Sequence, residues 1–300
     1  MNFFFVKDKN SKKNINISLI LSLVPLLIYG FYKNGIKLYS NELVGVSGLF
    51  KPLLFDLIGF IIGIIVYYVY ERLIKKNDIK LFRDIFSSFY PFYGLLIASL
   101  ISINSSMLLF SVITFVVMFI SLFISKFRVN VVSLTVLVII LITHLMGEFT
   151  YLNAYELNNV LHLDPLDYFM GLGSGGINTT CGFLLVGSLI YLFSKNYYKK
   201  EILVSSVISY CLLMFLYCFF KTDIKLFLDS IFSNGVLFSF IYIGTLFSFS
   251  PISIKGRYIY GLMVGVITFL LYLVYPSLAA IGAILIVSLC TNVIDKLVER

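Results

Sequence analysis

The amino-acid sequence predicts an all-α, polytopic membrane protein that crosses a bilayer about ten times, with both ends in the cytoplasm. Three observations support this fold class. Sixty per cent of the 300 residues are hydrophobic and only 13% are charged, whereas an ordinary soluble domain has about 25% charged residues. The apolar residues fall into runs of the length that a bilayer core of about 30 Å requires. Lysine and arginine gather in alternate loops, which is the pattern of cytoplasmic loops.

The apolar runs give the order of the predicted elements. The expected transmembrane helices lie at residues 15–32, 50–70, 86–103, 105–125, 129–147, 179–194, 202–220, 231–249, 258–275 and 277–294. The first run follows a group of lysine residues, as a secretory signal would. No small-residue cleavage site follows it, so a retained first helix is expected. Because no polar stretch is long enough for a soluble domain, residues 1–300 are expected to form a single transmembrane domain.

The distribution of charge tests this number of helices. Of the 23 basic residues, 18 fall in loops that the ten-helix arrangement places inside the cell. The other five are Lys33, Lys37, Lys51, Lys221 and Lys225. The longest outer loop, residues 148–170, carries acidic residues and no basic one. This alternation predicts that both termini are cytoplasmic.

Composition also indicates the cellular setting. The basic residues behind the net charge of +8 are spread through the loops, so the predicted partner of this charge is the lipid bilayer and not nucleic acid. Frequent Ile, Phe, Asn, Lys and Tyr without Trp are typical of an AT-rich bacterial genome, and we expect a bacterial plasma membrane. Five helices in each half place residues 1–147 and 165–300 in opposite orientations, as in inverted-repeat transporters.

A glycine-rich segment lies between the fifth and sixth predicted helices. Residues 171–182, called the glycine segment below, read Gly-Leu-Gly-Ser-Gly-Gly-Ile-Asn-Thr-Thr-Cys-Gly. Non-helical backbone at membrane depth occurs where protein buries it or where it lines a cavity. The start of the next helix and two threonine hydroxyl groups suit an anion or a phosphate. The candidate cofactor-binding residues are Gly173, Ser174, Gly175, Gly176, Asn178, Thr179 and Thr180. The alternative interpretation is a tight turn whose small residues allow close helix packing.

A second group of motifs follows later in the chain. It comprises Pro251, Lys255-Gly256-Arg257, Tyr260-Gly261 and Tyr275-Pro276. Together with Phe169-Met170-Gly171 and the glycine segment, and in this order, these motifs resemble the RnfD/NqrB family, whose members are membrane subunits of the Rnf complex and of the sodium-pumping NADH:quinone reductase. The resemblance is clearest over residues 165–295, with a weaker match at residues 86–98. It implies a membrane subunit of a flavin-dependent, ion-translocating electron transport complex, with other membrane subunits as partners.

The sequence departs from this family pattern at several polar positions. Members usually carry a serine-glycine-alanine-threonine signature whose threonine is esterified to FMN, and the nearest counterpart here ends in Tyr155. We therefore expect no covalent flavin at Tyr155. The family's motif glutamate is replaced by Thr179, its later glutamate by Ser277, and an aspartate is replaced near Leu246. Any FMN or riboflavin that the chain keeps is expected to bind non-covalently near the glycine segment.

Two other functions stay open at this point. Inverted halves with a broken helix also suit a small-solute channel or permease, and the lost polar positions suit a scaffold subunit without chemistry. No catalytic residue and no metal site are expected, since the four cysteines lie in or beside apolar runs without ligand spacing. Asp56, inside the second run, is either a functional intramembrane carboxylate or a side chain that snorkels to the outer interface.

Overall fold

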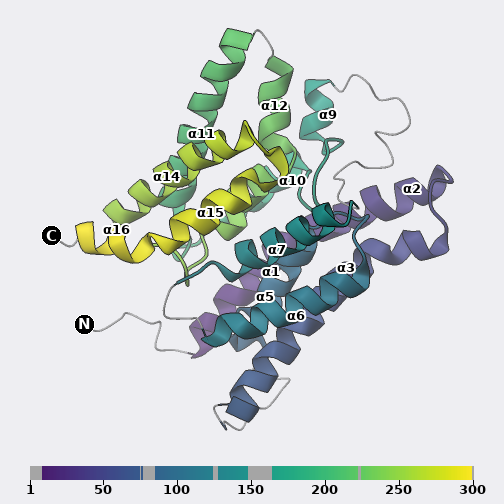
Figure 1. Ribbon diagram of the computed structural model, residues 1–300, viewed down its shortest axis with the longest axis horizontal. Helices are drawn as coiled ribbons and strands as arrows, with labels where there is room; N and C mark the ends of the chain where they lie inside the picture. The colour runs from purple at the N-terminus through teal and green to yellow at the C-terminus, as the bar shows by residue number, and fades with distance from the viewer. Residues whose placement is uncertain are drawn as a thin grey trace.

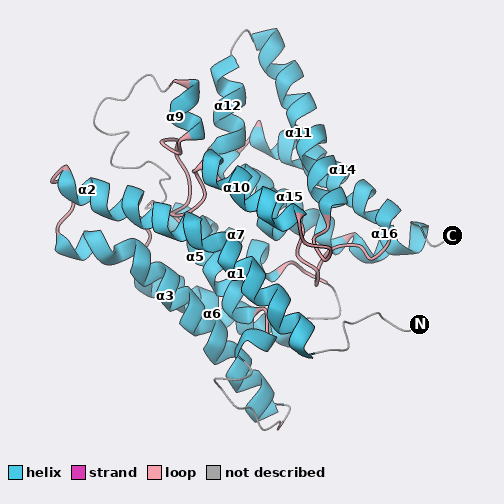
Figure 2. Ribbon diagram, turned by 180° about the vertical axis from the view of Figure 1, so that it is seen from behind, coloured by secondary structure: helices cyan, strands magenta, loops and turns pink. Residues whose placement is uncertain are grey.

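The described part of the chain is helical throughout. The computed structural model describes residues 9–74, 76, 85–123, 128–147, 164–221 and 224–298. Within these ranges the chain forms helices and loops, and no strand occurs (Figure 2). This confirms the predicted all-α class.

The first half of the chain begins with two long helical rods. Its elements are α1 (Lys9–Phe31), η1 (Tyr32–Ile36), α2 (Lys37–Ser40), α3 (Val46–Val69), η2 (Tyr70–Ile74), η3 (Ile85–Ser87), α5 (Tyr90–Leu100), α6 (Met107–Phe123) and α7 (Val131–Leu145). The first three elements form one rod, so the first predicted helix continues eight residues beyond residue 32. Its η1 portion is a wide π-helical turn with a buried lysine, a buried asparagine and a buried glycine.

The second half contains more interrupted helices. Its elements are α9 (Pro165–Phe169), α10 (Gly182–Phe193), α11 (Lys200–Lys221), α12 (Ile224–Phe232), α13 (Val236–Phe238), η5 (Ser239–Ile243), α14 (Ile254–Tyr272), η6 (Pro276–Leu278), α15 (Ala279–Leu289) and α16 (Thr291–Val298). The eighth predicted helix, residues 231–249, is wrong in its extent because the chain breaks between α12 and α13. Asn234 and Gly235 both have positive φ there, and an Asn-Gly pair favours such a turn.

Helix length supports fewer membrane crossings than the ten predicted. Four apolar helices in the described residues are long enough to cross a bilayer, and six if each of two bent pairs is one span. The bent pairs are α12 with α13–η5, at 45°, and η6–α15 with α16, at 53°. Four further apolar helices, α5, α6, α7 and α10, have 10–17 residues. Each predicted segment therefore contains an apolar helix, while ten crossings and the inverted relation of the halves stay predictions.

Small residues bring the helices close together in both halves. In the first half, the Cα of Gly94 in α5 lies so near Gly59 in α3 that an added Cβ would overlap the Gly59 carbonyl group. In the second half, Gly261 and Gly265 of α14 lie against Ser205 and Ser209 of α11. Spacing of small residues by four allows helix backbones to approach inside membranes. These two contacts fix the pairs α3–α5 and α11–α14.

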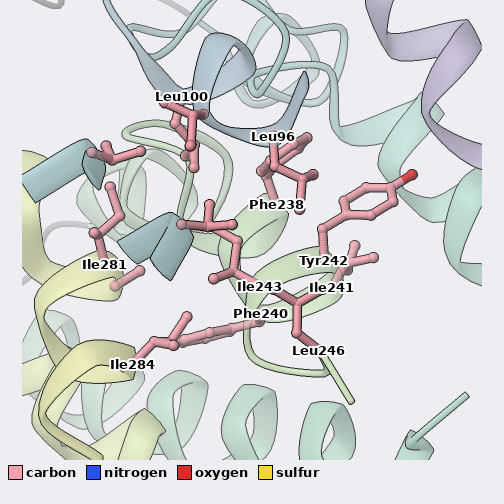
Figure 3. Close-up of a cluster of buried hydrophobic side chains, with 14 of the residues drawn as sticks. Leu96, Leu100, Phe238, Phe240, Ile241, Tyr242, Ile243, Leu246, Ile281 and Ile284 are labelled. Carbon is pink, nitrogen blue, oxygen red and sulfur yellow. The ribbon is translucent and has the colours of Figure 1, made fainter. Parts of the chain in front are cut away.

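The centre of the molecule is filled by apolar side chains where the short helix α5 approaches η5 and α15. Figure 3 shows these side chains gathered in one cluster, with the Tyr242 ring extending to one side, and those labelled are Leu96, Leu100, Phe238, Phe240, Ile241, Tyr242, Ile243, Leu246, Ile281 and Ile284. All of them are less than 5% exposed. The packed core therefore joins α5 to η5 and α15.

The ends of the helices define two sides of the molecule. Figure 1 shows α16 and the N-terminal end of α1 toward one side, and α2 and α9 toward the opposite side. The glycine segment follows α9 and precedes α10, so it begins near the side that carries α2. Which side faces the cytoplasm stays a prediction from the loop charges.

Candidate functional site: the glycine segment

The glycine segment is non-helical backbone held by two other parts of the chain. The amide of Ile177 donates to Ile101 O at 3.0 Å, and the amide of Asn178 donates to Ser99 O at 3.1 Å. On its other side, Asn234 N donates to Ser174 O at 2.8 Å. Non-helical backbone requires such partners at membrane depth. The segment therefore connects the end of α5 to the break between α12 and α13.

Two glycines in this segment are required by its close contacts. Gly171 has a φ of +91°, a region that side chains other than glycine rarely adopt. A Cβ at Gly176 would lie 2.6 Å from Ser99 O and 2.7 Å from the carbonyl carbon of Leu100. Gly176 thus allows the segment to pack against the end of α5, and Gly171 allows its left-handed backbone turn.

A buried lysine from the first rod reaches the segment. Lys33 Nζ donates to Gly173 O at 2.7 Å and to Thr180 Oγ1 at 3.0 Å, and its neighbour Asn34 donates through Nδ2 to Ile177 O at 2.8 Å. Both side chains come from the π-helical turn η1 and are buried. The assignment of Lys33 to an outer loop is therefore corrected. In the sequence, the signal for this buried lysine is a charged residue directly after an apolar run.

Asp56 also points into this site. Asn178 Nδ2 donates to Asp56 Oδ1 at 2.9 Å and to Ser99 Oγ at 3.1 Å. Asp56 is 6% exposed, so the snorkelling interpretation is wrong. Two oxygen atoms of the pair, Asp56 Oδ2 and Asn178 Oδ1, are buried without a hydrogen-bond partner. The site thus brings a carboxylate from α3 beside a motif in which Thr179 replaces the family's glutamate.

The threonine hydroxyl groups are bonded within the segment. Thr179 Oγ1 donates to Gly176 O at 3.2 Å, and Thr180 Oγ1 donates to Gly171 O at 3.0 Å. The start of α10 is covered by aromatic rings, because a Cβ at Gly182 would lie 2.6 Å from Phe232 Cδ1. In this arrangement the donors do not fit a flavin phosphate, which would have to displace these contacts. Non-covalent flavin binding at residues 173–180 stays a prediction.

The later motifs form a second buried site at the opposite end of α10. Lys199 Nζ donates to Ser250 Oγ at 2.6 Å, to Ser250 O at 3.3 Å and to Pro251 O at 3.2 Å. Arg257 of the Lys-Gly-Arg motif forms an ion pair with Glu201 at 3.3 Å. Burial, followed by the positive charge of Arg257, lowers the pKa of Lys199 to about 7. This site closes the loop that joins η5 to α14.

Other expected features have separate places. Tyr275 of the Tyr-Pro motif bonds through its hydroxyl group to His144 Nδ1 at 2.9 Å, on the side of α15 where the helix begins. Tyr155, the counterpart of the flavin-acceptor threonine, lies outside the described residues. Among the described residues, no group of three or more His, Cys, Asp or Glu side chains is placed to hold a metal ion.

Comparison with known proteins gives a family for the chain. No curated protein sequence matches it as a relative. The sequence model of the NQR2, RnfD, RnfE family matches residues 3–300. Since the match extends over almost the whole chain, including the glycine segment and the later motifs, the chain belongs to the NQR2, RnfD, RnfE family.

Proposed function

We propose that this chain is an integral membrane subunit of a flavin-dependent, ion-translocating electron transport complex in a bacterial plasma membrane. Family membership over residues 3–300 is the observation that carries the proposal. The apolar helices agree with a multi-pass membrane subunit of an Rnf- or Nqr-type complex. Ion translocation and flavin chemistry are the parts of the proposal that go beyond membership.

The chain's own residues would supply the frame for that chemistry. Flavins carry electrons in such complexes, while the protein supplies position and electrostatics. Here Lys33 bonds to the glycine segment, which precedes α10, and Lys199 bonds to the loop between η5 and α14. A rigid interior of this kind suits a subunit that fixes the distance between electron carriers in its partners.

The packed centre bears on the alternative of a small-solute channel or permease. Such proteins bind their substrate near the bilayer midplane between interrupted helices. Here the space between α5, the break after α12 and α15 is occupied by large apolar side chains such as Leu96, Phe238 and Ile284 (Figure 3). This filling favours the electron-transport proposal over a solute path in the conformation described.

The test is purification of the chain from native membranes through an affinity tag. We expect it to bring with it other membrane subunits and flavin, detected by flavin absorbance, and we expect its deletion to abolish electron transfer from reduced carriers in membrane vesicles. A chain that purifies alone, without flavin, and that mediates solute uptake in liposomes would contradict the proposal and support the permease. A flavin-free chain in a complex of unchanged activity would support the scaffold.

Flavin attachment needs a separate measurement. We propose that FMN or riboflavin, where this chain binds one, is held non-covalently, since Tyr155 stands where the family has its acceptor threonine. Denaturing gels of the chain coexpressed with a flavin transferase should show no fluorescent band. A fluorescent band that disappears in Tyr155→Phe would contradict this.

A further inference from the structure

Asp56 places a carboxyl group deep within a membrane-spanning helix. It lies ten residues after Val46, the first residue of α3. At about 1.5 Å per residue this is about 15 Å along the helix. The side chain is 6% exposed and points toward the glycine segment. Ionisable residues at such depth usually mark paths for ions or protons.

The carboxyl group has one hydrogen-bond donor and no cationic partner in the described part of the chain. Asn178 Nδ2 donates to its Oδ1, whereas Oδ2 is buried without a partner. The nearby cationic side chains are directed elsewhere: Lys33 Nζ bonds to Gly173 O and Thr180 Oγ1, and Lys51 Nζ lies over the Phe55 ring.

Among the described residues, the elements packed around α3 supply no charge partner to the Asp56 carboxyl group. They are α1, η1, α2, α5, α6 and η2. Their described titratable side chains, with that of the glycine segment, are Lys12, Lys13, Tyr29, Tyr32, Lys33, Lys37, Tyr39, Tyr70, Glu71, Arg72, Tyr90, Tyr93 and Cys181. The hydrogen bond of Tyr29 goes to Met170 O, and that of Tyr93 joins it to Ser248. In the described residues, burial and the Asn178 hydrogen bond define the environment of Asp56.

A carboxylate in this environment must be neutralised. Transfer of an unpaired charge into an apolar interior is so unfavourable that the group takes up a proton or binds a cation. Ca²⁺ and Mg²⁺ require about six or more oxygen ligands, and the unpartnered oxygens of this pair are Asp56 Oδ2 and Asn178 Oδ1. One proton is sufficient for two such atoms. These two oxygen atoms therefore favour a proton over a calcium or magnesium ion.

We propose that Asp56 is a proton-binding site inside the membrane and that the Asn178 amide serves both of its protonation states. A proton from the aqueous phase forms an O–H bond with the carboxylate, and its release reverses this step without oxidation or reduction. The ionised form accepts from Asn178 Nδ2, which lies 2.9 Å from Asp56 Oδ1. After a half-turn of the amide, the neutral form donates to Asn178 Oδ1.

The neighbourhood of the amide suits this half-turn. Asn178 Oδ1 and Ile177 O lie 1.8 Å and 2.8 Å from the position that a Cβ at residue 30 would occupy. Gly30 thus leaves room for either orientation. The inference adds a ligand site to the proposed subunit, and it does not require that the chain bind flavin.

The test is infrared spectroscopy of the purified full chain in lipid nanodiscs during a pH titration. We expect the carbonyl stretch of a protonated carboxylic acid at neutral pH, its loss at alkaline pH, and its absence from Asp56→Asn at every pH. Glu42→Gln, which removes an exposed carboxyl group in the turn between α2 and α3, should retain the band. Asn178→Leu should retain it at a shifted frequency, because the hydrogen bond to the amide is lost.

Three outcomes would overturn the site. The first is identical spectra for wild type and Asp56→Asn, and the second is an unshifted band in Asn178→Leu. The third is loss of the band when sodium replaces choline at constant pH, which would show a metal-cation site. The Asn178→Leu measurement decides the matter even where Asp56→Asn fails to fold. Because the isolated chain is measured, failure here leaves the electron-transport proposal untouched.

Discussion

Lys33 and Lys199 are buried lysines that bond to main-chain carbonyl groups where a helix is interrupted. Lys33 follows α1 and holds the glycine segment, and Lys199 follows α10 and holds Ser250 and Pro251. A long apolar stem can be buried while the ammonium group satisfies carbonyl oxygens that a broken helix leaves unpaired. The sequence predicts Lys33 in a loop, and no local pattern reveals that either lysine bonds inward.

The lowered pKa of Lys199 predicts a pH-dependent stability. Its ordinary pKa is 10.5 and its folded value is about 7. Between these values the unfolded chain binds one more proton than the folded chain, so stability should rise with pH over this window. Thermal unfolding in detergent should show this rise in wild type and in the control Lys200→Met, whose side chain is exposed. Lys199→Met should lack it, and parallel curves for all three proteins would contradict the prediction.

Gly30→Ala should displace part of the glycine segment, although residue 30 is remote from that segment in sequence. Its Cβ would overlap Asn178 Oδ1 and displace the amide from Asp56 and Ser99. Overpacking of this kind costs about 1–3 kcal/mol, so a lower thermal unfolding temperature is expected. Gly187→Ala is the matched control, because nothing lies within 4 Å of a Cβ there, and alanine in a helix should stabilise by about 0.5–1 kcal/mol. Equal stability of the two variants would argue against the contact.

At the scale of helices, small residues decide which neighbours pair. Gly265 of α14 lies so close to α11 that a Cβ would overlap Ser209 Oγ and approach Ser206 O. Since a backbone carbonyl cannot move away as a side chain can, the helices would have to separate. The pairing of α11 with α14 therefore depends on this glycine.

Gly265→Ala should reduce stability by about 1–3 kcal/mol, measured as a lower midpoint of thermal unfolding in detergent. Leu270→Ala on the same helix is the control, because Leu270 is 55% exposed on the outer face of the bundle. Its unfolding midpoint should stay near that of wild type. A larger loss in Leu270→Ala than in Gly265→Ala would show that the helix pair tolerates separation.

The positions of apolar helices could be predicted from sequence, and their interruptions could not. Hydropathy depends on composition over a window, so it extended the eighth helix across Asn234 and Gly235 and the last helix across the bend at Cys290. The Asn-Gly pair was a usable turn signal. The contact of Asp56 with Asn178 joins residues 122 positions apart, and no local pattern encodes such a pairing.

At the scale of the whole molecule, α16 and the start of α1 lie on the side opposite α2 and α9 (Figure 1). Loop charge predicts that the first side is cytoplasmic. The loop-charge rule predicts only which side of the protein is cytoplasmic. Helix length in the described residues supports four to six spans. Labelling can test direction and number independently.

Single cysteines in a background without native cysteines provide this test. Lys76→Cys, after η2, should react with a membrane-impermeant maleimide only after the cells are opened. Leu166→Cys, in α9 and 74% exposed, should react in intact cells. External labelling at position 76 would contradict the predicted orientation, and labelling of both positions from one side would contradict the number of crossings between them.

Because Asp56 lies deep in the membrane span, the membrane potential should change its affinity for a proton. The span from Val46 to Arg72 has 27 residues, about 40 Å at the usual helical rise, and Asp56 lies about 15 Å from its predicted outer end. A proton that enters from there crosses about a third of the electric field. Full crossing is worth about 2.3 kcal/mol per 100 mV, so an interior-negative potential would favour the proton at Asp56 by about 0.8 kcal/mol per 100 mV. The protonated fraction of Asp56 would then depend on the membrane potential of the cell.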